Sequence, residues 1–279
     1  MSCPALHDTV QHVGDSRDFI ETFAKGLAVI QAFSETSPAL TITDVAQRTG
    51  LSRAAARRFL LTLETLGFAE RLDGRTFTLT ARVLLLGNAY LSSMPMWRFA
   101  EPVLSQMVED IGETCSISVL DGTEVVYVLR IPVHRILDRI STIGSRLPAY
   151  CTSMGRLLLA YLPDAALDTY FVRTPLLPYT ARTLTDEGAL RASLLMIRRQ
   201  GYAWLNGEMS VNLNGLAVPI YDRHGRVMAA LNVSIRRPDV DPDHLLRTIV
   251  PYMRRAAQQI SSSTMIACGQ LEQASASAL

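Results

Sequence analysis

Apolar residues recur every three to four positions near the start of the chain. Between Phe19 and Glu35 they fall at Phe23, Leu27 and Ile30, and less regularly at two further positions. This spacing predicts a helix, because residues three and four apart share one helix face. Ser37–Ala39 then interrupts the pattern with residues typical of a turn.

Two short helices are predicted directly after this turn. Thr41 and Asp44 fit a capping box, and Gly50 fits the end of the first helix. Ser52 is placed to cap the second helix, whose apolar positions follow one stripe. The stripe consists of Ala56, Phe59, Leu60, Leu63 and Leu66.

A hairpin and a further helix complete this part of the chain. The runs Phe68–Leu72 and Thr76–Thr80 alternate like strands and flank the turn sequence "DGR". The stretch "ARVLLLGNAYLSS" returns to helical character and could connect two domains.

The pattern changes from about Met94 onward. Helical stretches alternate with strand-like runs, and "TCSISVL–DG–TEVVYVLR" has an Asp-Gly turn between two of them. Hairpins mixed with helices favour an antiparallel α+β domain. We therefore predict five regions: a flexible arm at 1–18, a domain of helices and a hairpin at 19–80, a linker helix at 81–95, an α+β domain at 96–263 and a flexible tail at 264–279.

Composition excludes several classes of protein. The chain is 48% hydrophobic with a formal net charge of +1, so any basic surface must be local. Its start lacks the apolar run of a secretory signal, and the longest apolar clusters are too short to span a bilayer. The four cysteines lie far apart and form no C-x-x-C motif, which predicts reduced thiols in a cytoplasmic protein.

Positive charge is nevertheless concentrated between Thr41 and Arg82. This segment holds seven arginines against four carboxylates, a net charge of +3. Helix, turn, helix and hairpin in this order are typical of a winged helix-turn-helix, whose second helix enters the major groove. A solvated basic face is the alternative, but the order of elements favours DNA. The predicted DNA-binding residues are Thr43, Ser52, Arg53, Ala54, Arg57, Arg58 and Arg75.

The sequence resembles the IclR family of bacterial transcriptional regulators. The resemblance is carried by "FAKGLAVIQAF", "TITDVAQRTGLSRAAARRFLLTLETLGF", "LPAYCTSMGRLLLA" and "GLAVPIYDRHGRVMAALNVS", in the family's order from Phe19 to Ser263. "LPAYCTSMGR" and "AKGLAVIQAF" look most like the branch that regulates protocatechuate, 4-hydroxybenzoate and β-ketoadipate catabolism. The resemblance implies a winged helix, a linker helix, a GAF-like effector domain with an antiparallel sheet, and a homodimer or dimer of dimers on DNA.

The resemblance also implies a site for a small organic acid. Matching positions place it at a loop-to-helix element and at polar residues of nearby strands. A helix start with free N–H groups can receive a carboxylate, although it can equally be an ordinary capped helix. The carried-over residues are Thr152, Ser153, Met154, Gly155, Leu205, Gly215, Asn232 and Ser234. Leu205 and Gly215 replace polar residues of the glyoxylate and pyruvate type, so we expect a roomier, less polar pocket that fits an aromatic acid.

Five other side chains are weaker candidates for this pocket. Arg135 and Arg139 could offer a second contact to an anion, and His134 could serve a phenolic hydroxyl, although surface positions are the more common outcome for such residues. Tyr150 and Trp204 could wall the pocket or could belong to the core.

The sequence predicts a regulator rather than an enzyme. No nucleophile motif, phosphate-binding loop, dinucleotide fingerprint or metal-ligand spacing is present, so no catalytic residue, metal or cofactor is expected. The predicted partners are operator DNA, a small organic acid, a second copy of the chain and, for an activator, RNA polymerase; no membrane is expected. The alternatives are a repressor that senses an aliphatic keto acid and a small-molecule-binding α+β protein without DNA binding.

Overall fold

The computed structural model describes residues 18–93, 96–133, 142–236, 241, 243 and 245–276. The chain divides into two compact units, Met1–Tyr90 and Leu91–Leu279, and each is described by itself. The division falls inside the predicted linker helix. The predicted arm at 1–18 lies outside the described residues except for Asp18.

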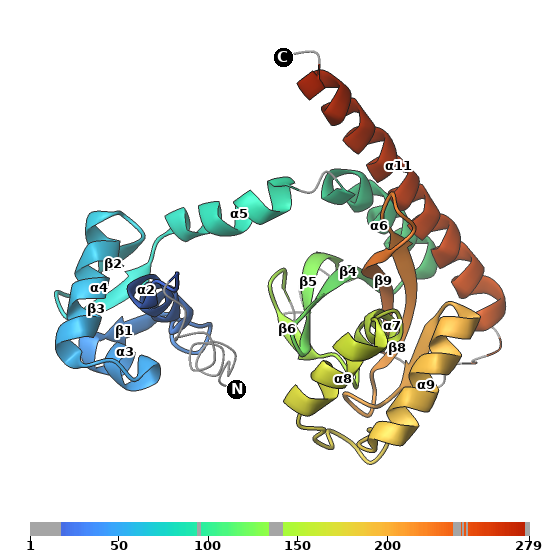
Figure 1. Ribbon diagram of the computed structural model, residues 1–279, viewed down its shortest axis with the longest axis horizontal. Coiled ribbons are helices and arrows are strands. Elements are labelled where there is room, and N and C mark those ends of the chain that lie inside the picture. The colour runs from blue at the N-terminus through green and yellow to red at the C-terminus, as the bar shows by residue number, and fades with distance from the viewer. Residues whose placement is uncertain are drawn as a thin grey trace. The chain divides into compact units, whose positions relative to one another are not determined.

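The N-terminal unit is a winged helix-turn-helix (Figure 1). Its three short strands form one antiparallel sheet in the order β1-β3-β2. A 3₁₀ turn and helix α5 follow. The elements are α2 (Glu21–Gln31), β1 (Ala39–Thr41), α3 (Ile42–Thr49), α4 (Arg53–Thr65), β2 (Ala69–Arg71), β3 (Thr76–Leu79), η1 (Ala81–Val83) and α5 (Leu84–Ser93).

The predicted caps of α3 and α4 are confirmed, whereas the first helix is shorter than predicted and ends at Gln31. The hydroxyl of Thr41 accepts a hydrogen bond from the backbone N–H of Asp44 at 3.2 Å, and the Asp44 carboxylate accepts one from the N–H of Thr41 at 2.8 Å. Gly50 ends α3 with a φ of 69°, in the left-handed region that favours glycine. Ser52 caps α4 by accepting from the N–H of Ala55 at 3.2 Å.

The core of this unit differs from the predicted stripes at two positions. Ala56 and Leu60 of α4 are fully buried, but Leu66 is 53% exposed because it is the C-cap residue, beyond the last turn that packs on the core. Helix α2 buries Ala24 and Val29 and leaves Phe23 67% exposed. Strand β1, which pairs with β3, was not among the predicted elements.

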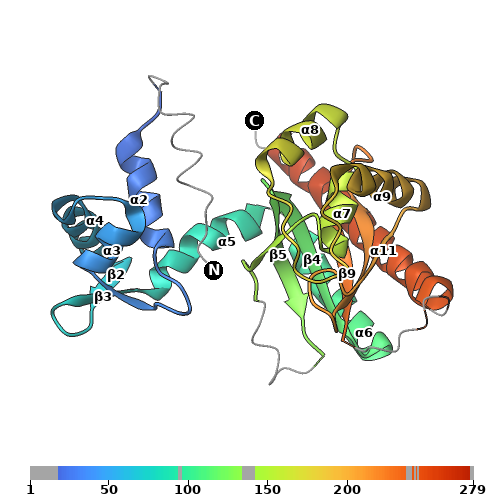
Figure 2. The same cartoon turned by 90° about the horizontal axis from the view of Figure 1, so that it is seen from below.

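The C-terminal unit is a six-stranded antiparallel sheet between two layers of helices (Figure 2). The strand order is β6-β5-β4-β9-β8-β7. Helices α6 and α11 cover one face, and α7, α8 and α9 cover the other. The strands are β4 (Thr114–Asp121), β5 (Glu124–Ile131), β6 (Arg146–Pro148), β7 (Ala203–Asn206), β8 (Asn214–Tyr221) and β9 (Val227–Ile235). The helices are α6 (Met96–Ile111), α7 (Ser153–Ala160), α8 (Asp164–Arg173), α9 (Glu187–Gln200), η2 (Leu245–Ile249) and α11 (Val250–Ala276).

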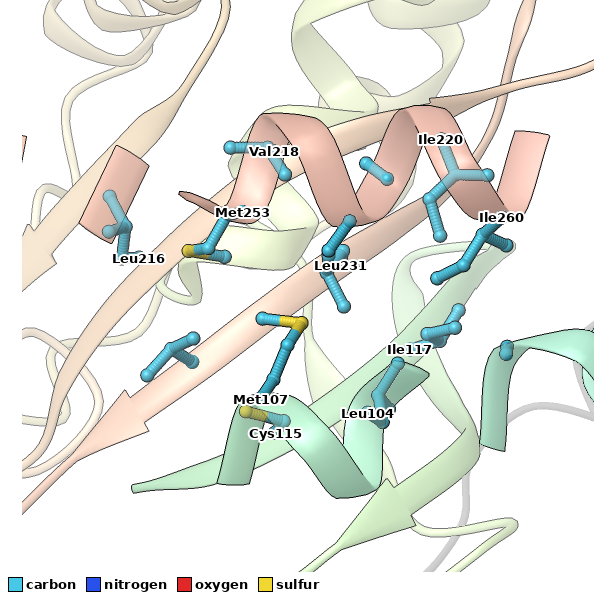
Figure 3. Packing of buried hydrophobic residues seen from close by; sticks show 14 of the residues in the cluster. Leu104, Met107, Cys115, Ile117, Leu216, Val218, Ile220, Leu231, Met253 and Ile260 are labelled. Carbon is cyan, nitrogen blue, oxygen red and sulfur yellow. The ribbon is translucent and has the colours of Figure 1, made fainter. Parts of the chain in front are cut away.

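Each face of this sheet has its own hydrophobic core. On the α6 and α11 side, Leu104, Met107 and Met253 from the helices meet Ile117 and Leu231 from the strands, and all five are fully buried (Figure 3). On the opposite side, residues of α7 and α9 pack against β5, β7 and β8. The sheet is therefore covered on both sides, which confirms the predicted antiparallel α+β class.

Most predicted elements of this unit are present. The Asp-Gly turn joins β4 and β5, with Gly122 at a φ of 62°. Helix α8 was not predicted, and α11 continues to Ala276, through most of the segment predicted to be a flexible tail. Among the described residues, no helix is long and apolar enough to cross a membrane.

Candidate DNA interface and effector site

Helix α4 presents three arginines to solvent at its N-terminal half. Arg53, Arg57 and Arg58 are exposed, and no carboxylate of the described chain pairs with any of them. The buried residues Ala56 and Leu60 fix the opposite side of the helix against the core. The basic side of α4 is therefore free to meet a partner, as the sequence predicted it would be.

Three other arginines of the segment are occupied within the unit. Arg48 donates to the carbonyl of Ala32 at 3.0 Å and to the hydroxyl of Ser37 at 2.7 Å. Arg71 donates to both carboxylate oxygens of Glu64, at 3.1 and 3.0 Å. Arg82 lies over an aromatic ring. The structure thus separates arginines that hold the fold together from those on α4.

The hairpin tip is held by Asp73. Its carboxylate accepts bonds from the hydroxyl and the N–H of Thr76, both at 2.7 Å, and from the N–H of Arg75 at 3.0 Å. These bonds, led by the Thr76 hydroxyl, lower the pKa of Asp73 to about 2. The carboxylate is thus ionised at neutral pH and fixes the turn, while the side chain of Arg75 is exposed.

The remaining predicted contacts lie on the same two helices. Thr43 is exposed in the first turn of α3, and Ser52 and Ala54 are exposed at the start of α4. Helix α4 follows α3 after the turn at Gly50, so these residues and the arginines belong to one helix-turn-helix. Their contact with DNA stays a prediction.

A small cavity opens between α7, the sheet and the loop after β7. Its space, including the open mouth, is about 360 Å³, of which about 30 Å³ can hold the centre of a water molecule. It is therefore narrow in this structure. The lining residues are Tyr127, Leu147, Cys151, Thr152, Ser153, Met154, Leu205, Glu208, Met209, Leu213, Asn214, Gly215, Asn232 and Ser234. They include seven of the eight predicted effector residues; Gly155 is the exception.

The polar floor of the cavity follows from strand alternation. Asn232 and Ser234 are two apart on β9 and share a face, and Ser116 of β4 pairs with Asn232 in the sheet. The amide oxygen of Asn232 accepts from the hydroxyls of Ser234 at 2.9 Å and Ser116 at 3.3 Å. Its amide nitrogen donates to the Ser153 hydroxyl at 2.8 Å and the Leu216 carbonyl at 3.1 Å. Asn232, only 2% exposed, therefore joins two strands to α7.

Two glycines let α7 approach its neighbours. A β-carbon at position 155 would come within 3.0 Å of the backbone of Ala149, and one at position 215 would come equally close to the hydroxyl of Ser153. Neither distance is sterically possible without movement. Thr152 caps the helix by accepting from the N–H of Gly155 at 3.2 Å. Gly155 is thus required for packing, and Gly215 makes room for Ser153.

A buried ion pair borders the cavity and was not predicted. Arg156 of α7 donates to the carboxylate of Glu208 at 2.5 Å and to the carbonyl of Tyr150 at 2.8 Å. Glu208 also accepts from the N–H of Leu184 at 3.2 Å. Because 52 positions separate Arg156 from Glu208, no local sequence pattern could have revealed their pairing.

The two aromatic candidates do not line the cavity. Tyr150 is 2% exposed, and its hydroxyl donates to the carbonyl of Leu177 at 2.6 Å and accepts from its N–H at 2.9 Å. Trp204 packs against the core on the α6 and α11 side, whereas its neighbour Leu205 faces the cavity. His134, Arg135 and Arg139 lie outside the described residues.

Burial makes the described thiols unreactive. Desolvation, with a smaller contribution from Glu113, raises the pKa of Cys115 to about 12. Desolvation, with a smaller contribution from Glu208, raises the pKa of Cys151 to about 12. Both cysteines are free. Within the described part of the chain, no group of three or more His, Cys, Asp or Glu residues could hold a metal ion.

The chain combines a helix-turn-helix whose second helix exposes basic side chains with a sheet domain that holds a small polar cavity. This combination defines a ligand-responsive transcriptional regulator. The chain belongs to the IclR family. Residues 22–73 match the IclR helix-turn-helix domain, and residues 88–262 match the C-terminal domain of the bacterial transcriptional regulator IclR.

Known relatives are similar over most of the chain. The Pca regulon regulatory protein of Pseudomonas putida is 42% identical over 244 residues, which cover 87% of this chain and 84% of that protein. The p-hydroxybenzoate hydroxylase transcriptional activator of Acinetobacter baylyi is 36% identical, with coverage of 88% and 92%. The crystal structure of an IclR homolog from Microbacterium hydrocarbonoxydans, complexed with 4-hydroxybenzoate, is 26% identical with a TM-score of 0.76, and the match covers 88% of this chain and 99% of that one.

Proposed function

We propose that this protein is an activator of genes for aromatic-acid degradation that responds to an acid of the 4-hydroxybenzoate, protocatechuate or β-ketoadipate class. One observation carries this proposal: the guanidinium groups of Arg53, Arg57 and Arg58 are exposed on the second helix of a helix-turn-helix and pair with no carboxylate of the described residues. The effector class is supported by the names of the two relatives and by the 4-hydroxybenzoate complex.

The DNA contacts divide into two kinds. Residues at the start of a recognition helix meet base edges, and guanidinium groups suit guanine and phosphate. We assign base contacts to Arg53 and Arg57 and phosphate contacts to Arg58 and Arg75. Thr43, Ser52 and Ala54 complete the surface, since small side chains let the helix approach the duplex closely.

The cavity supports an aromatic acid rather than a two- or three-carbon keto acid. Its walls carry Leu147, Leu205 and Leu213, while the floor and the first turn of α7 supply polar groups. Met154 and Met209 also line it, and methionine side chains repack easily around a ligand. The cavity is narrow in this structure, so we expect the effector to displace these flexible side chains as it enters. Such a displacement is a route from binding to a change in DNA affinity.

Activity on DNA requires partners beyond the effector. The N-terminal unit exposes Leu84, Leu85 and Leu86, at 72%, 60% and 51%, together with Tyr90 of α5. Such contiguous apolar surface marks an interaction site, and we assign it to a homodimer, which is a building block for a dimer of dimers. An activator also contacts RNA polymerase. Because operator DNA and RNA polymerase are both in the cytoplasm of a bacterium, we place the protein there.

Catalysis is not part of the proposal. Cys151 is the one thiol among the described residues that line the cavity; burial holds it protonated, and a nucleophile needs a neighbouring base. His224 is not placed to act as that base, because it lies in the turn between β8 and β9, at the end of these strands opposite the cavity residue Gly215.

Two measurements test the proposed function. A mobility-shift assay on the promoter nearest the gene should show sequence-selective binding that weakens as salt rises. A thermal-shift panel should show a raised melting temperature with 4-hydroxybenzoate, protocatechuate or β-ketoadipate and none with glyoxylate or pyruvate. Absence of a selective shift contradicts the regulator, and a response to glyoxylate alone contradicts the effector class.

A further inference from the structure

One arginine of the effector domain lies beside the cavity without an acidic partner among the described residues. Arg130 of β5 pairs in the sheet with Ser116 of β4, which pairs in turn with Asn232 of β9. Its neighbours Leu129 and Ile131 belong to the core under α6 and α11. Because side chains alternate along a strand, Arg130 is on the α7 face, in one cross-strand row with the polar floor of the cavity.

Arg130 is half-buried, and two of its three guanidinium nitrogens are buried without a hydrogen-bond partner in the described chain. Its Nε and Nη1 atoms are inaccessible to solvent, and none of the described residues accepts a hydrogen bond from either of them. The group lies over the ring of Tyr127, 5.0 Å from the ring centroid. Buried N–H groups of a cation without acceptors are costly and uncommon in folded proteins.

Other buried or half-buried arginines of this unit are paired. Arg156 bonds to Glu208 at 2.5 Å, and Arg146 bonds to Glu124 at 2.7 Å and to Asp121 at 2.8 Å. Glu208, the carboxylate that lines the cavity, is thus already neutralised. Arg130 differs from these arginines because two of its nitrogens can still donate hydrogen bonds to an anion.

Tyr127 connects Arg130 to the cavity. Its side chain both lines the cavity and lies under the guanidinium. Ser118 pairs with Tyr127 in the sheet and is fully buried, and its hydroxyl likewise has no hydrogen-bond partner among the described residues. Unused hydrogen-bonding groups therefore gather at the Tyr127 end of the cavity, away from the Asn232 network, whose groups are bonded to one another.

We propose that Arg130 binds the carboxylate of the effector and makes the site selective for acids. This inference rests on the proposed function and deepens it. A guanidinium donates two parallel hydrogen bonds to a carboxylate, and burial strengthens them. With the carboxylate at Arg130, the ring of an aromatic acid extends past Tyr127, and its phenolic hydroxyl is left for the first turn of α7. The start of α7 then receives the second polar group of the effector rather than its carboxylate.

The test compares an acid with its neutral isostere. Binding of 4-hydroxybenzoate and 4-hydroxybenzamide is measured by calorimetry for the wild type, Arg130→Met and the control Arg191→Met. Arg191 pairs with Asp168 and Glu187 and does not line the cavity. We expect the wild type and the control to prefer the acid by on the order of tenfold or more, because an ionised hydrogen bond is the stronger kind. Arg130→Met should bind both compounds equally, and Arg130→Lys should keep part of the preference.

The outcomes separate this inference from the proposed function. If Arg130→Met still prefers the acid as strongly as the wild type does, the assignment of Arg130 is wrong although the effector class stands. If the wild type binds none of 4-hydroxybenzoate, protocatechuate and β-ketoadipate, the effector class is wrong and the assignment falls with it. Should that variant fail to fold, Arg130→Gln carries the same comparison.

Discussion

Ser153 of α7 and Gly215 of β8 meet where the helix crosses the sheet, and the Cβ of Ser153 lies 3.0 Å from the place that a β-carbon at position 215 would take. The contact lets the hydroxyl of Ser153 accept the 2.8 Å bond from Asn232. A glycine in one strand therefore positions the helix that begins at the cavity.

Gly215→Ala should destabilise the effector domain and weaken its response to the effector. The added methyl group must push Ser153 away, and overpacking of this kind costs about 1–3 kcal/mol. Urea unfolding measures the change in the free energy of unfolding. Gly26→Ala is the control, because a β-carbon there meets Phe59 at an ordinary 3.7 Å. If the two variants have the same free energy of unfolding, α7 can shift away from the sheet without cost, and the contact of Ser153 with Gly215 does not position the helix.

Arg57→Ala should weaken operator binding while the melting temperature stays the same, because the side chain is exposed and bonds to nothing in the described chain. Because Arg57 is assigned to a base edge, the loss should depend on sequence, and the slope of log affinity against log salt should change by less than the roughly 0.9 expected for one phosphate contact. Fluorescence anisotropy at several salt concentrations gives both quantities. Arg199→Ala removes the same charge from α9 and should change neither. A melting temperature lowered in Arg57→Ala would instead make this arginine structural.

Cys115 and Cys151 should resist iodoacetamide in the native protein at pH 8. A thiol whose pKa is raised to about 12 stays protonated below that pH, so only about one in ten thousand is the reactive thiolate at pH 8. Reactivity should rise only as the pH approaches 12 or as the protein unfolds. Peptide mass spectrometry after alkylation measures this. Effector binding should protect Cys151 further but leave Cys115 unchanged, because only Cys151 lines the cavity.

Replacing Leu84 and Leu85 together by Glu should convert the proposed homodimer to a monomer. Burial of one leucine contributes about 1.5–3 kcal/mol, and a charge in its place opposes association. Light scattering after size-exclusion chromatography gives the mass in solution. Val172→Glu is the matched control, since Val172 is 87% exposed on α8. A double variant that remains dimeric would place the dimer contact elsewhere.

Local features of the fold could be predicted from the sequence. The capping box of Thr41 and Asp44 and the glycine at position 50 depend on a few neighbouring residues, so the pattern alone sufficed. Alternation likewise put Asn232 and Ser234 on one face. The burial of α2 could not be predicted in the same way, because its apolar residues surround more than one face and only tertiary packing selects Val29 over Phe23.

Contacts between segments that are distant in the sequence could not be predicted from it. Glu208 and Arg130 gave no local pattern, since the role of each depends on which carboxylate or arginine the sheet brings near. Trp204 and Leu205 point to opposite faces of the four-residue strand β7, and both faces are covered, so alternation could not say which residue meets the cavity. Gly215 was expected to widen the pocket. In the structure the side chain of Ser153 instead occupies the space that a β-carbon at position 215 would take.

The pairing of β4 with β9 has a consequence for biosynthesis. Thr114–Ser118 are joined to Ala230–Ser234 across more than a hundred intervening residues, so a growing chain exposes one edge of β4 until nearly the whole effector domain has left the ribosome. The winged helix, built from neighbouring segments, needs no such delay. Chains truncated before Val227 would therefore contain a folded DNA-binding domain and an unpaired edge of β4. Because an unpaired strand edge promotes aggregation, we expect such chains to aggregate rather than to act as unresponsive regulators.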